Sequence, residues 1–440
     1  MTTRAFPVRL PLTGAVALPG VLLGAADYLG LPHPDLPAPV AAAVFGIAIV
    51  AAAFLLSWAA EAAQVDVSAG LAIAVLAMVA VLPEYAVDLV FTFEAGQEYA
   101  AKGTCASDPG QPDPCSLALA NMTGANRVLV GLGWPLVVLV AGLAVRRRRA
   151  SNPSSTSSTS AGAGRVTLAP VMSAEVVFLG AATLYSLTLP LRTSLTLVDA
   201  AVFAAVFVAY VWRLAKAPVE EPDLHGVSAW VGGQRRRGRV VLGLFAFAGL
   251  VILASAEHFA SNLVDTGSSL GVEEFLLVQW VAPLASEAPE LIVACLYAAR
   301  LRASDALGTL LSSKVNQWTL LVGSLPVVFA LSAGTSAGLP LDGHQRLELL
   351  LTAAQSLFAV SLLAALGLSA RAAVVLFALF AAQFTASVTL SADGNRIATL
   401  VLSGVYLVLA VAGLARRRHE ALRTARDGFA TPFGELAERT

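Results

Sequence analysis

The chain has 440 residues, of which 57% are hydrophobic and only 13% are charged, and its mean hydropathy is +0.75. A soluble domain carries about 25% charged residues, so this composition excludes a protein whose whole surface faces water. The formal net charge of −1 conceals a strong asymmetry of charge along the chain.

The apolar residues form segments of roughly 20 residues, each long enough to cross about 30 Å of hydrocarbon as a helix. We predict twelve spans, near 12–30, 38–60, 69–94, 116–145, 168–190, 196–215, 239–264, 271–299, 305–333, 347–368, 371–388 and 396–415. The sequence therefore predicts an all-α, polytopic membrane protein.

The first predicted span follows Arg4 and Arg9 and is interrupted by Pro19. A cleaved signal peptide has the same features, so that alternative stays open for 12–30.

Lys and Arg concentrate on one side of these spans. Of the 28 such residues, 22 fall in segments on the side of the two termini, which include 146–167, 213–239 and the C-terminal tail. Four fall on the other side: Lys102, Arg192, Arg346 and Arg396. Because cytoplasmic segments carry the excess of positive charge, we expect both termini in the cytoplasm and the chain in the inner (plasma) membrane. The same topology explains the short basic clusters, so nucleic acid is not an expected partner.

Two of the three cysteines, Cys105 and Cys115, share a predicted outer loop and can pair in an oxidising compartment. Cys295 lies in a predicted span, where it is expected to be a small packing residue.

Two predicted cytoplasmic linkers punctuate the chain, a basic and Ser-rich one at 146–164 and a charged one near 217–239. The second linker separates two halves of comparable size. We predict five sections: an extra helix (1–37), a first repeat (38–215), a linker (216–238), a second repeat (239–390), and a last helix with a cytoplasmic tail (391–440).

The two halves resemble each other. LAMVAVLPEYAVDLVF, in the Pro-Glu helix 69–94, is followed by ALANMTGANRVLVGLGWP, and WVAPLASEAPELIVACL, in the Pro-Glu helix 271–299, is followed by ALGTLLSSKVNQWTLLVGSLP. The first Pro-Glu lies on a span that runs outward and the second on a span that runs inward. The repeats are therefore predicted to be inverted, as in many secondary transporters, with discontinuous helices at the midplane.

Glu84 and Glu290 lie mid-span, directly after Pro83 and Pro289. Proline frees a backbone carbonyl on the preceding turn, so each helix is expected to be kinked or broken there. A free carbonyl beside a carboxylate is a hard-oxygen site for Ca²⁺ or Na⁺. A buried acid kept only for packing specificity is the alternative, but a carboxylate costs about 2.5–3.5 kcal/mol at a helix centre, so two at matched positions favour function.

Neighbouring acids suggest proton exchange. Asp88 follows Glu84 by four residues and Glu287 precedes Glu290 by three, so each pair shares a helix face. Two such carboxylates cannot both ionise easily without a cation, so one should take up a proton when the site is empty. Asp88 lies nearer the outer end of its span, and simple hydration explains it equally well.

Two basic residues lie within predicted spans. Lys314 either snorkels to the inner surface or, as we favour, pairs with Glu287 or Glu290. Arg127 either pairs with Asp88 or lines a water-filled cavity.

Neutral oxygen donors cluster near these carboxylates in both repeats. Singly, each can be a contact between helices, but together they are typical of a coordination shell: Asn121, Thr123, Asn126, Ser286, Ser312, Ser313, Asn316 and Gln317. Glu175 and the pair Glu257-His258 also lie in or near spans, and His258 is expected to be structural rather than a proton carrier.

With these residues in view, the chain resembles the cation/calcium exchanger superfamily, the sodium/calcium and calcium/proton antiporters, most specifically in the stretch 256–290. That family has two inverted repeats, each with Gly-Thr-Ser-x-Pro-Glu and then a Gly-Ser-Asn/Asp motif. The resemblance implies that Glu84 and Glu290 are the central ion-binding residues and that Asn126 is a ligand of the first repeat. Lys314 falls where the second repeat normally has Asp or Asn.

This sequence departs from the family pattern at several places. Ala80, Val81 and Leu82 replace the hydroxyl residues before Pro83, and Glu287 and Lys314 replace a serine and a ligand. The Lys314 ammonium can occupy one cation subsite permanently, which predicts altered stoichiometry or a monovalent cation.

The sequence thus predicts a secondary cation antiporter rather than an enzyme. It would exchange Ca²⁺ or Na⁺ against H⁺, or Na⁺ against Ca²⁺, with no cofactor beyond the transported ions. Its partners are the lipid bilayer and these ions, and a homo-oligomer stays open. A Na⁺/H⁺ exchanger with a lysine-occupied site and a non-transporting sensor on the same fold are the alternatives.

Overall fold

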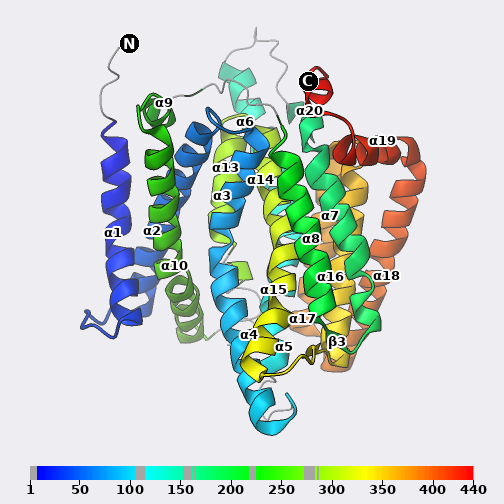
Figure 1. Cartoon of the computed structure of the whole chain (residues 1–440). Helices are drawn as coiled ribbons and strands as arrows, with labels where there is room; N and C mark the ends of the chain where they lie inside the picture. Colours follow the sequence, from blue (N-terminus) through cyan, green and yellow to red (C-terminus); the bar gives the residue numbers. More distant parts are fainter. Residues whose placement is uncertain are drawn as a thin grey trace. The chain divides into compact units, whose positions relative to one another are not determined.

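The computed structural model of the chain describes residues 7–105, 114–151, 161–162, 164–217, 224, 226–271, 283–284 and 287–439. In this part of the chain, ten helices are long and apolar enough to cross a membrane. Two further apolar helices are shorter, α3 (Ala69–Ala80) and α13 (Ala288–Ala299). The predicted all-α membrane class is confirmed (Figure 1). The predicted count of twelve full spans is not confirmed, since the described residues contain ten such helices and part of the second Pro-Glu segment lies outside them.

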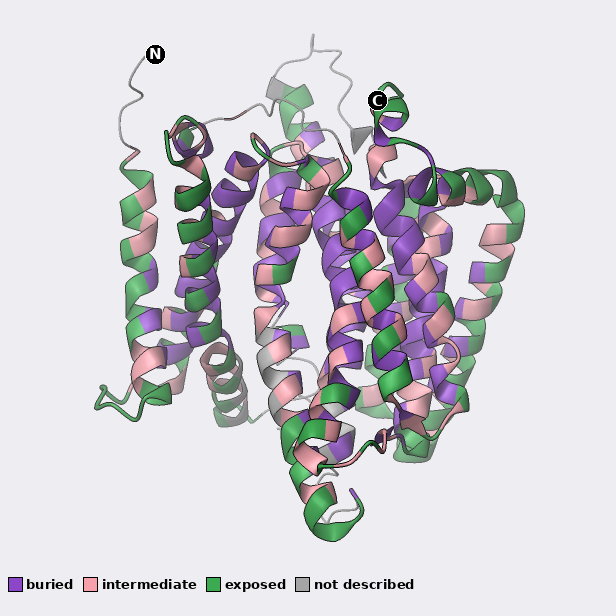
Figure 2. Cartoon of the chain, in the orientation of Figure 1, coloured by how far each residue is buried: buried purple, intermediate pink, exposed green. Residues whose placement is uncertain are grey.

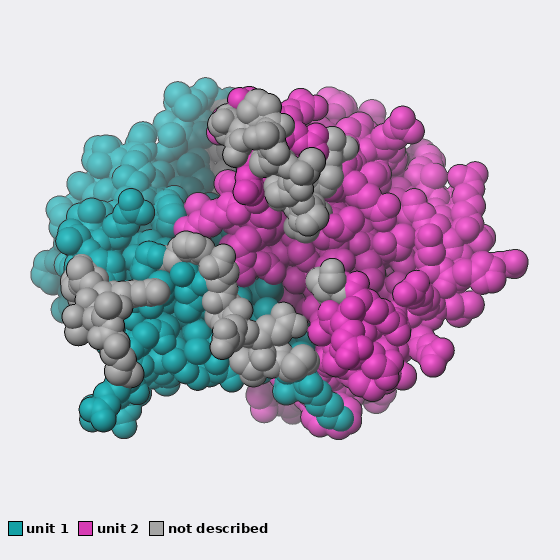
Figure 3. Space-filling model, turned by 90° about the horizontal axis from the view of Figure 1, so that it is seen from above, with its two compact units in different colours: residues 1–86, 214–293 teal, residues 87–213, 294–440 magenta. Residues whose placement is uncertain are grey.

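The chain divides into two compact units, and each unit takes segments from both halves of the sequence (Figure 3). Unit 1 comprises residues 1–86 and 214–293, and unit 2 comprises residues 87–213 and 294–440. The division therefore falls inside α4 (Leu82–Lys102) and α13.

Unit 1 is built around two long helices packed side by side, α2 (Ala38–Ala63) and α10 (Arg237–Ser269). Small residues allow α1 to approach both closely: a Cβ added at Gly24 would lie 1.7 Å from the Ala254 carbonyl oxygen, and one at Gly20 would lie 2.6 Å from Ala48 Cβ. Such close backbone contact is typical of helices packed in lipid. The helices of this unit, besides α3 and the first turns of α4 and α13, are α1 (Arg9–Tyr28), α2 (Ala38–Ala63), α9 (Gly226–Gly232) and α10 (Arg237–Ser269).

Unit 2 holds the remaining elements. Its α-helices are α5 (Pro114–Val128), α6 (Trp134–Ser151), α7 (Ser173–Ser186), α8 (Leu197–Leu214), α14 (Ala303–Asn316), α15 (Val322–Ala333), α16 (Gly343–Leu363), α17 (Ala370–Thr389), α18 (Ala392–Arg416), α19 (Arg418–Phe429) and α20 (Phe433–Ala437). Two π-helices, η1 (Leu129–Gly133) and η5 (Gln317–Leu321), connect α5 to α6 and α14 to α15. Two 3₁₀ turns are η2 (Pro170–Met172) and η3 (Leu189–Leu191).

Two small antiparallel sheets tie loops of unit 2 together. β2 (Arg165–Thr167) pairs with β1 (Ala161–Gly162) and with β5 (Gly367–Ser369), while β3 (Ser194–Leu195) pairs with β4 (Leu339–Pro340). Each sheet joins segments that the charge distribution assigns to one side of the membrane. The pairing is therefore consistent with the predicted order of spans.

Helix α16 lies inside unit 2 and contacts α7 and α18. A capping box begins it, in which Asp342 Oδ1 accepts from the Gln345 N–H (2.7 Å) and Gln345 Oε1 accepts from the Asp342 N–H (2.8 Å). In contrast, α18 exposes apolar side chains such as Leu400, Val401 and Val408, and Figure 2 shows α18 largely exposed on one face. An apolar exposed face on a helix of this length is the surface expected to contact lipid.

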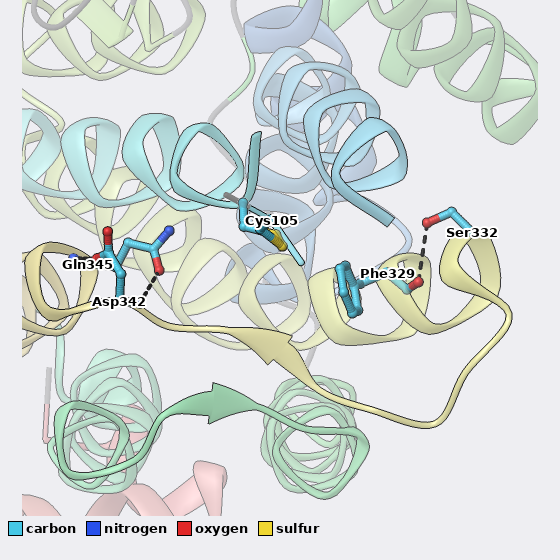
Figure 4. Close-up of a disulfide and its surroundings, with 6 residues drawn as sticks. Cys105, Phe329, Ser332, Asp342 and Gln345 are labelled. Atoms are coloured by element: carbon cyan, nitrogen blue, oxygen red, sulfur yellow. Dashed lines mark hydrogen bonds between the residues drawn. A yellow bond between two sulfur atoms is a disulfide. The ribbon is translucent and has the colours of Figure 1, made fainter. Parts of the chain in front are cut away.

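The sequence left open whether Cys105 and Cys115 are bonded, and the structure pairs them in a disulfide with the two Cα atoms 5.8 Å apart. It closes the loop that follows α4. Figure 4 shows it together with the start of α16 and the end of α15, where Ser332 donates to the Phe329 carbonyl oxygen (3.2 Å).

Candidate ion-binding site

The two Pro-Glu motifs begin helices in the same register. Helix α3 ends at Ala80 and α4 begins at Leu82, so Glu84 is the third residue of α4. Helix α13 begins at Ala288, so Glu290 is likewise its third residue. Proline is tolerated in a first turn because its missing N–H is not needed there. The predicted break at Pro83 is confirmed, and each carboxylate lies at the positive end of a helix dipole.

Three glutamates of unit 1 are fully buried: Glu84, Glu287 and Glu290 are each 0% exposed. A buried carboxylate is stable only where hydrogen bonds, a cation or a bound proton compensate for lost hydration. In the part of the chain that the structure describes, no three or more His, Cys, Asp or Glu side chains gather as metal ligands do. Carboxylates alone therefore do not complete a described metal site, and amide, hydroxyl or carbonyl oxygens would have to supply the other ligands.

Asp88, one turn after Glu84 in α4, is also 0% exposed, so simple hydration does not explain it. Asn121 Nδ2 in α5 donates to Asp88 Oδ1 (3.0 Å), and Thr92 Oγ1 donates to the Asp88 carbonyl oxygen (2.6 Å). The structure thus brings together two of the predicted site residues, Asp88 and Asn121.

Lys314 is buried in unit 2, which excludes the alternative that it snorkels to the inner surface. Its Nζ donates to Asn126 Oδ1 (2.6 Å) and to the Asn126 carbonyl oxygen (3.2 Å). The Asn126 amide is held in turn, since its Nδ2 donates to the Met122 carbonyl oxygen (2.8 Å). The ammonium also lies 4.8 Å from the centre of the Trp318 ring, a cation–π distance. An ion pair with Glu287 or Glu290 would join residues of different units and stays a prediction.

Asn126 and Lys314 occupy matching positions relative to the two π-helices. Each lies three residues before a π-helix, Asn126 before η1 and Lys314 before η5. π-Helices in proteins are short and frequently mark functional sites. Sequence reasoning missed both, because no local residue pattern distinguishes such a segment from a continuous α-helix.

Arg127 forms an ion pair with Glu348 of α16, so the suggested pairing with Asp88 is wrong. Arg127 Nε also donates to the Thr123 carbonyl oxygen (3.1 Å). With these two partners, Arg127 is only 4% exposed. Glu348 was not singled out from the sequence, since nothing local connects it to α5.

The other predicted oxygen donors are mostly buried as well. Tyr210 in α8 donates to Ser312 Oγ (2.9 Å), and Thr123 Oγ1 donates to the Leu119 carbonyl oxygen (2.9 Å). Ser313, Asn316 and Gln317 are at most 2% exposed. Ser286 lies outside the described residues.

Three further residues that the sequence analysis singled out, Glu175, Glu257 and His258, lie outside these helices. Glu175 is buried in α7 of unit 2. Tyr28 donates to Glu257 Oε2 (2.6 Å), and His258 stacks on Phe45 with ring centres 5.0 Å apart. These contacts agree with a structural His258.

The comparisons with known proteins match the chain over both repeats. The family described as sodium/calcium exchanger protein matches residues 38–216 and 240–412. Among solved structures, the H⁺/Ca²⁺ exchanger CAX is 36% identical, with 98% of each chain covered and a TM-score of 0.76.

Two structures of the sodium-calcium exchanger NCX_Mj share the fold at lower identity. One, soaked with 2.5 mM Na⁺ and 10 mM Sr²⁺, is 13% identical over 84% of this chain and 100% of that one, with a TM-score of 0.53. The other, soaked with zero Na⁺ and Ca²⁺, is 15% identical over 79% and 100%, with a TM-score of 0.51. No curated protein sequence matches the chain. The match over both repeats places this protein in the sodium/calcium exchanger family, as a multi-pass membrane cation exchanger and not an enzyme.

Proposed function

We propose that the protein exchanges Ca²⁺ for H⁺ by alternating access, in the inner (plasma) membrane and with both termini in the cytoplasm. The observation that carries this proposal is the matched register of Glu84 and Glu290, each fully buried in the first turn of a helix that begins with a Pro-Glu motif. The 36% identity to an H⁺/Ca²⁺ exchanger supports the choice of ions.

The chemistry follows from the cost of burying these carboxylates. An occupied site neutralises them with the cation, and an empty site neutralises them with protons, because buried acids without a cation favour the protonated form. Loss of Ca²⁺ on one side of the membrane is thereby coupled to uptake of H⁺ on that side. Glu84 and Glu290 are the proposed ion ligands, and Glu287 is the proposed proton-binding neighbour.

Lys314 favours a narrower version of this function. Its ammonium occupies a position at which the resemblance implies a cation ligand, and it is already bound by two oxygens of Asn126. A resident positive charge leaves room for fewer transported ions. This same feature favours Na⁺/H⁺ exchange as the second candidate.

Proton flux in proteoliposomes tests the proposal. The full chain is reconstituted with a pH gradient, and Ca²⁺, Na⁺ or K⁺ is added in turn. We expect Ca²⁺ to collapse the gradient with the wild type, and Glu84→Gln and Glu290→Gln to reduce this flux to the level of protein-free vesicles, since a neutral amide cannot exchange a proton for a cation. Glu94→Gln is the matched control, because Glu94 is an exposed glutamate on the same helix as Glu84.

The ion that collapses the gradient names the substrate. Collapse by Na⁺ and not by Ca²⁺ would replace the proposal with Na⁺/H⁺ exchange. Flux in Glu290→Gln equal to that of the wild type would contradict the assigned role of Glu290. Ion binding without flux of any of the three ions would indicate the sensor alternative.

A further inference from the structure

A basic cavity opens in unit 2, and its lining in the described part of the chain includes no residue of α4 or α13. Its volume is about 460 Å³, and it lies among β2, the connection from α16 to α17, and the C-terminal helix α19. Figure 1 shows α19 running across the end of the neighbouring helices of this unit, near the C-terminus. All three segments belong to the side of the membrane that the charge distribution predicts to be cytoplasmic.

Positive charge dominates the cavity lining. Its ionisable residues are four arginines and two acids: Arg165, Arg417, Arg423, Arg439, Glu420 and Asp427. Two more guanidinium groups than carboxylates give the lining a formal charge of +2. The buried acid Asp427 is neutralised from within the lining, since Arg439 Nη1 lies 3.1 Å from its Oδ2. Arg423 Nε lies 3.8 Å from the same oxygen.

The other two arginines are held by neutral groups. Arg165 Nη2 donates to the Ala365 carbonyl oxygen (3.2 Å), and Arg417 Nη1 donates to the Leu362 carbonyl oxygen (3.1 Å). Across the described ranges, neither guanidinium has a carboxylate within ion-pair distance. A guanidinium has five N–H donors, so each retains donors for another acceptor after its backbone bond.

The backbone makes room for one of these groups. A Cβ added at Gly367 would lie 2.7 Å from Arg165 Nε and 2.9 Å from its Nη2, so a larger residue would displace the guanidinium. The backbone of Arg165 pairs with Ser369 between β2 and β5, which places this exposed arginine beside Gly367 at the cavity.

We propose that this cavity binds a phosphate group, held by Arg165 and Arg417, and that the bound phosphate links the β2–β5 sheet to the start of the C-terminal tail. Arginine is suited to phosphate because its planar fork donates two parallel, charge-assisted hydrogen bonds. An anionic phospholipid of the cytoplasmic leaflet or a soluble phosphate can supply this group. The proposal does not depend on the ion that the protein exchanges.

Thermal unfolding of the purified full chain tests the proposal and separates the two sources. One arm adds vesicles of phosphatidylcholine with or without phosphatidylglycerol, and the other adds inorganic phosphate or, as an ionic-strength control, chloride. We expect the phosphate-bearing probe to raise the Tm of the wild type, because a ligand that binds only the folded state stabilises it. In Arg165→Gln/Arg417→Gln the shift should fall to about half or less of its wild-type value.

The matched control is Arg416→Gln/Arg418→Gln, which removes the same amount of charge from two residues that flank Arg417 and lie outside the cavity lining. It should keep the full shift. A shift with phosphatidylglycerol alone assigns the site to a lipid, and a shift with inorganic phosphate assigns it to a soluble compound. Equal loss of the shift in both double variants, or no shift with either probe, would overturn the proposal.

Line broadening in the phosphorus NMR spectrum of inorganic phosphate or of short-chain phosphatidylglycerol provides a test that needs no variant. Broadening by the wild type that an excess of chloride does not reverse supports the site, and its absence with both probes contradicts it.

Discussion

Lys314 shows how one residue can change an exchanger. A buried ammonium is stable only if neighbouring groups replace its hydration. Asn126 supplies two oxygens and Trp318 supplies the face of its ring. Since lysine belongs to the chain itself, we expect Lys314 to contribute a fixed positive charge that no transported ion carries.

Replacing that fixed charge should change what is carried. We expect Lys314→Asp to raise the number of positive charges transported per turnover or to shift ion preference, since it replaces a cation with a potential ligand. The ratio of Ca²⁺ to H⁺ flux, measured together in proteoliposomes, gives the stoichiometry. Lys314→Arg keeps the charge and is the control. Unchanged stoichiometry and unchanged preference in Lys314→Asp would exclude this role.

At the scale of elements, the π-helices η1 and η5 interrupt two matching helices of unit 2. A π-segment widens a helix locally and alters which side chains face a neighbour. Here η1 contacts α17 very closely: a Cβ added at Gly131 would lie 2.5 Å from both Cβ and Cγ of Phe380. The close contact between η1 and α17 therefore requires a residue without a side chain at position 131.

Gly131→Ala should destabilise the protein by about 1–3 kcal/mol, the usual cost of overpacking, and should reduce exchange because Asn126 lies just before η1. Gly142→Ala in α6 is the matched control, since a Cβ there meets nothing within 4 Å. The measurements are the Tm in detergent and flux in proteoliposomes. Equal Tm values for the two variants would contradict the close contact with Phe380.

At the scale of the whole molecule, the asymmetry of Lys and Arg predicts the side on which each loop lies. The β2–β5 pair joins loops assigned to the cytoplasm, and the β3–β4 pair joins loops assigned to the outer side. The Cys105–Cys115 disulfide belongs to another predicted outer loop, where an oxidising compartment would preserve it.

Chemical labelling tests this topology. In a background without native cysteines, Lys102→Cys should react with a membrane-impermeant thiol reagent in intact cells. Lys216→Cys should react only after the cells are permeabilised, because Lys216 is the first residue of the predicted cytoplasmic linker 216–238. Both lysines are exposed, and both variants replace a lysine with a cysteine. A difference in reactivity therefore reports the side of the membrane on which each residue lies. The reverse labelling pattern would contradict the predicted orientation.

The sequence predicted features that depend on local chemistry. The helix break at Pro83 follows from the missing N–H of proline. Two cysteines in one short loop made the Cys105–Cys115 pair possible, but the sequence did not decide it. The membrane class follows from composition, because lipid is the only solvent that accepts so many apolar side chains.

Features that depend on distant packing were missed. The partner of Arg127 is Glu348, which lies in the other half of the sequence, so no spacing rule connects the two. The contact of Lys314 with Asn126 of the other repeat was missed for the same reason. Neither π-helix was predicted, and η1 lies against a distant residue, Phe380, that no local pattern connects to it.

The contact between Asn126 and Lys314 also limits which residues the two repeats can carry at this place. The two residues hold equivalent places in the two repeats, yet they touch each other. Two copies with lysine at this place would set two ammonium groups against each other, whereas two copies with asparagine would be compatible. Lysine is therefore admissible in one copy only, and only while the other keeps an uncharged or acidic acceptor.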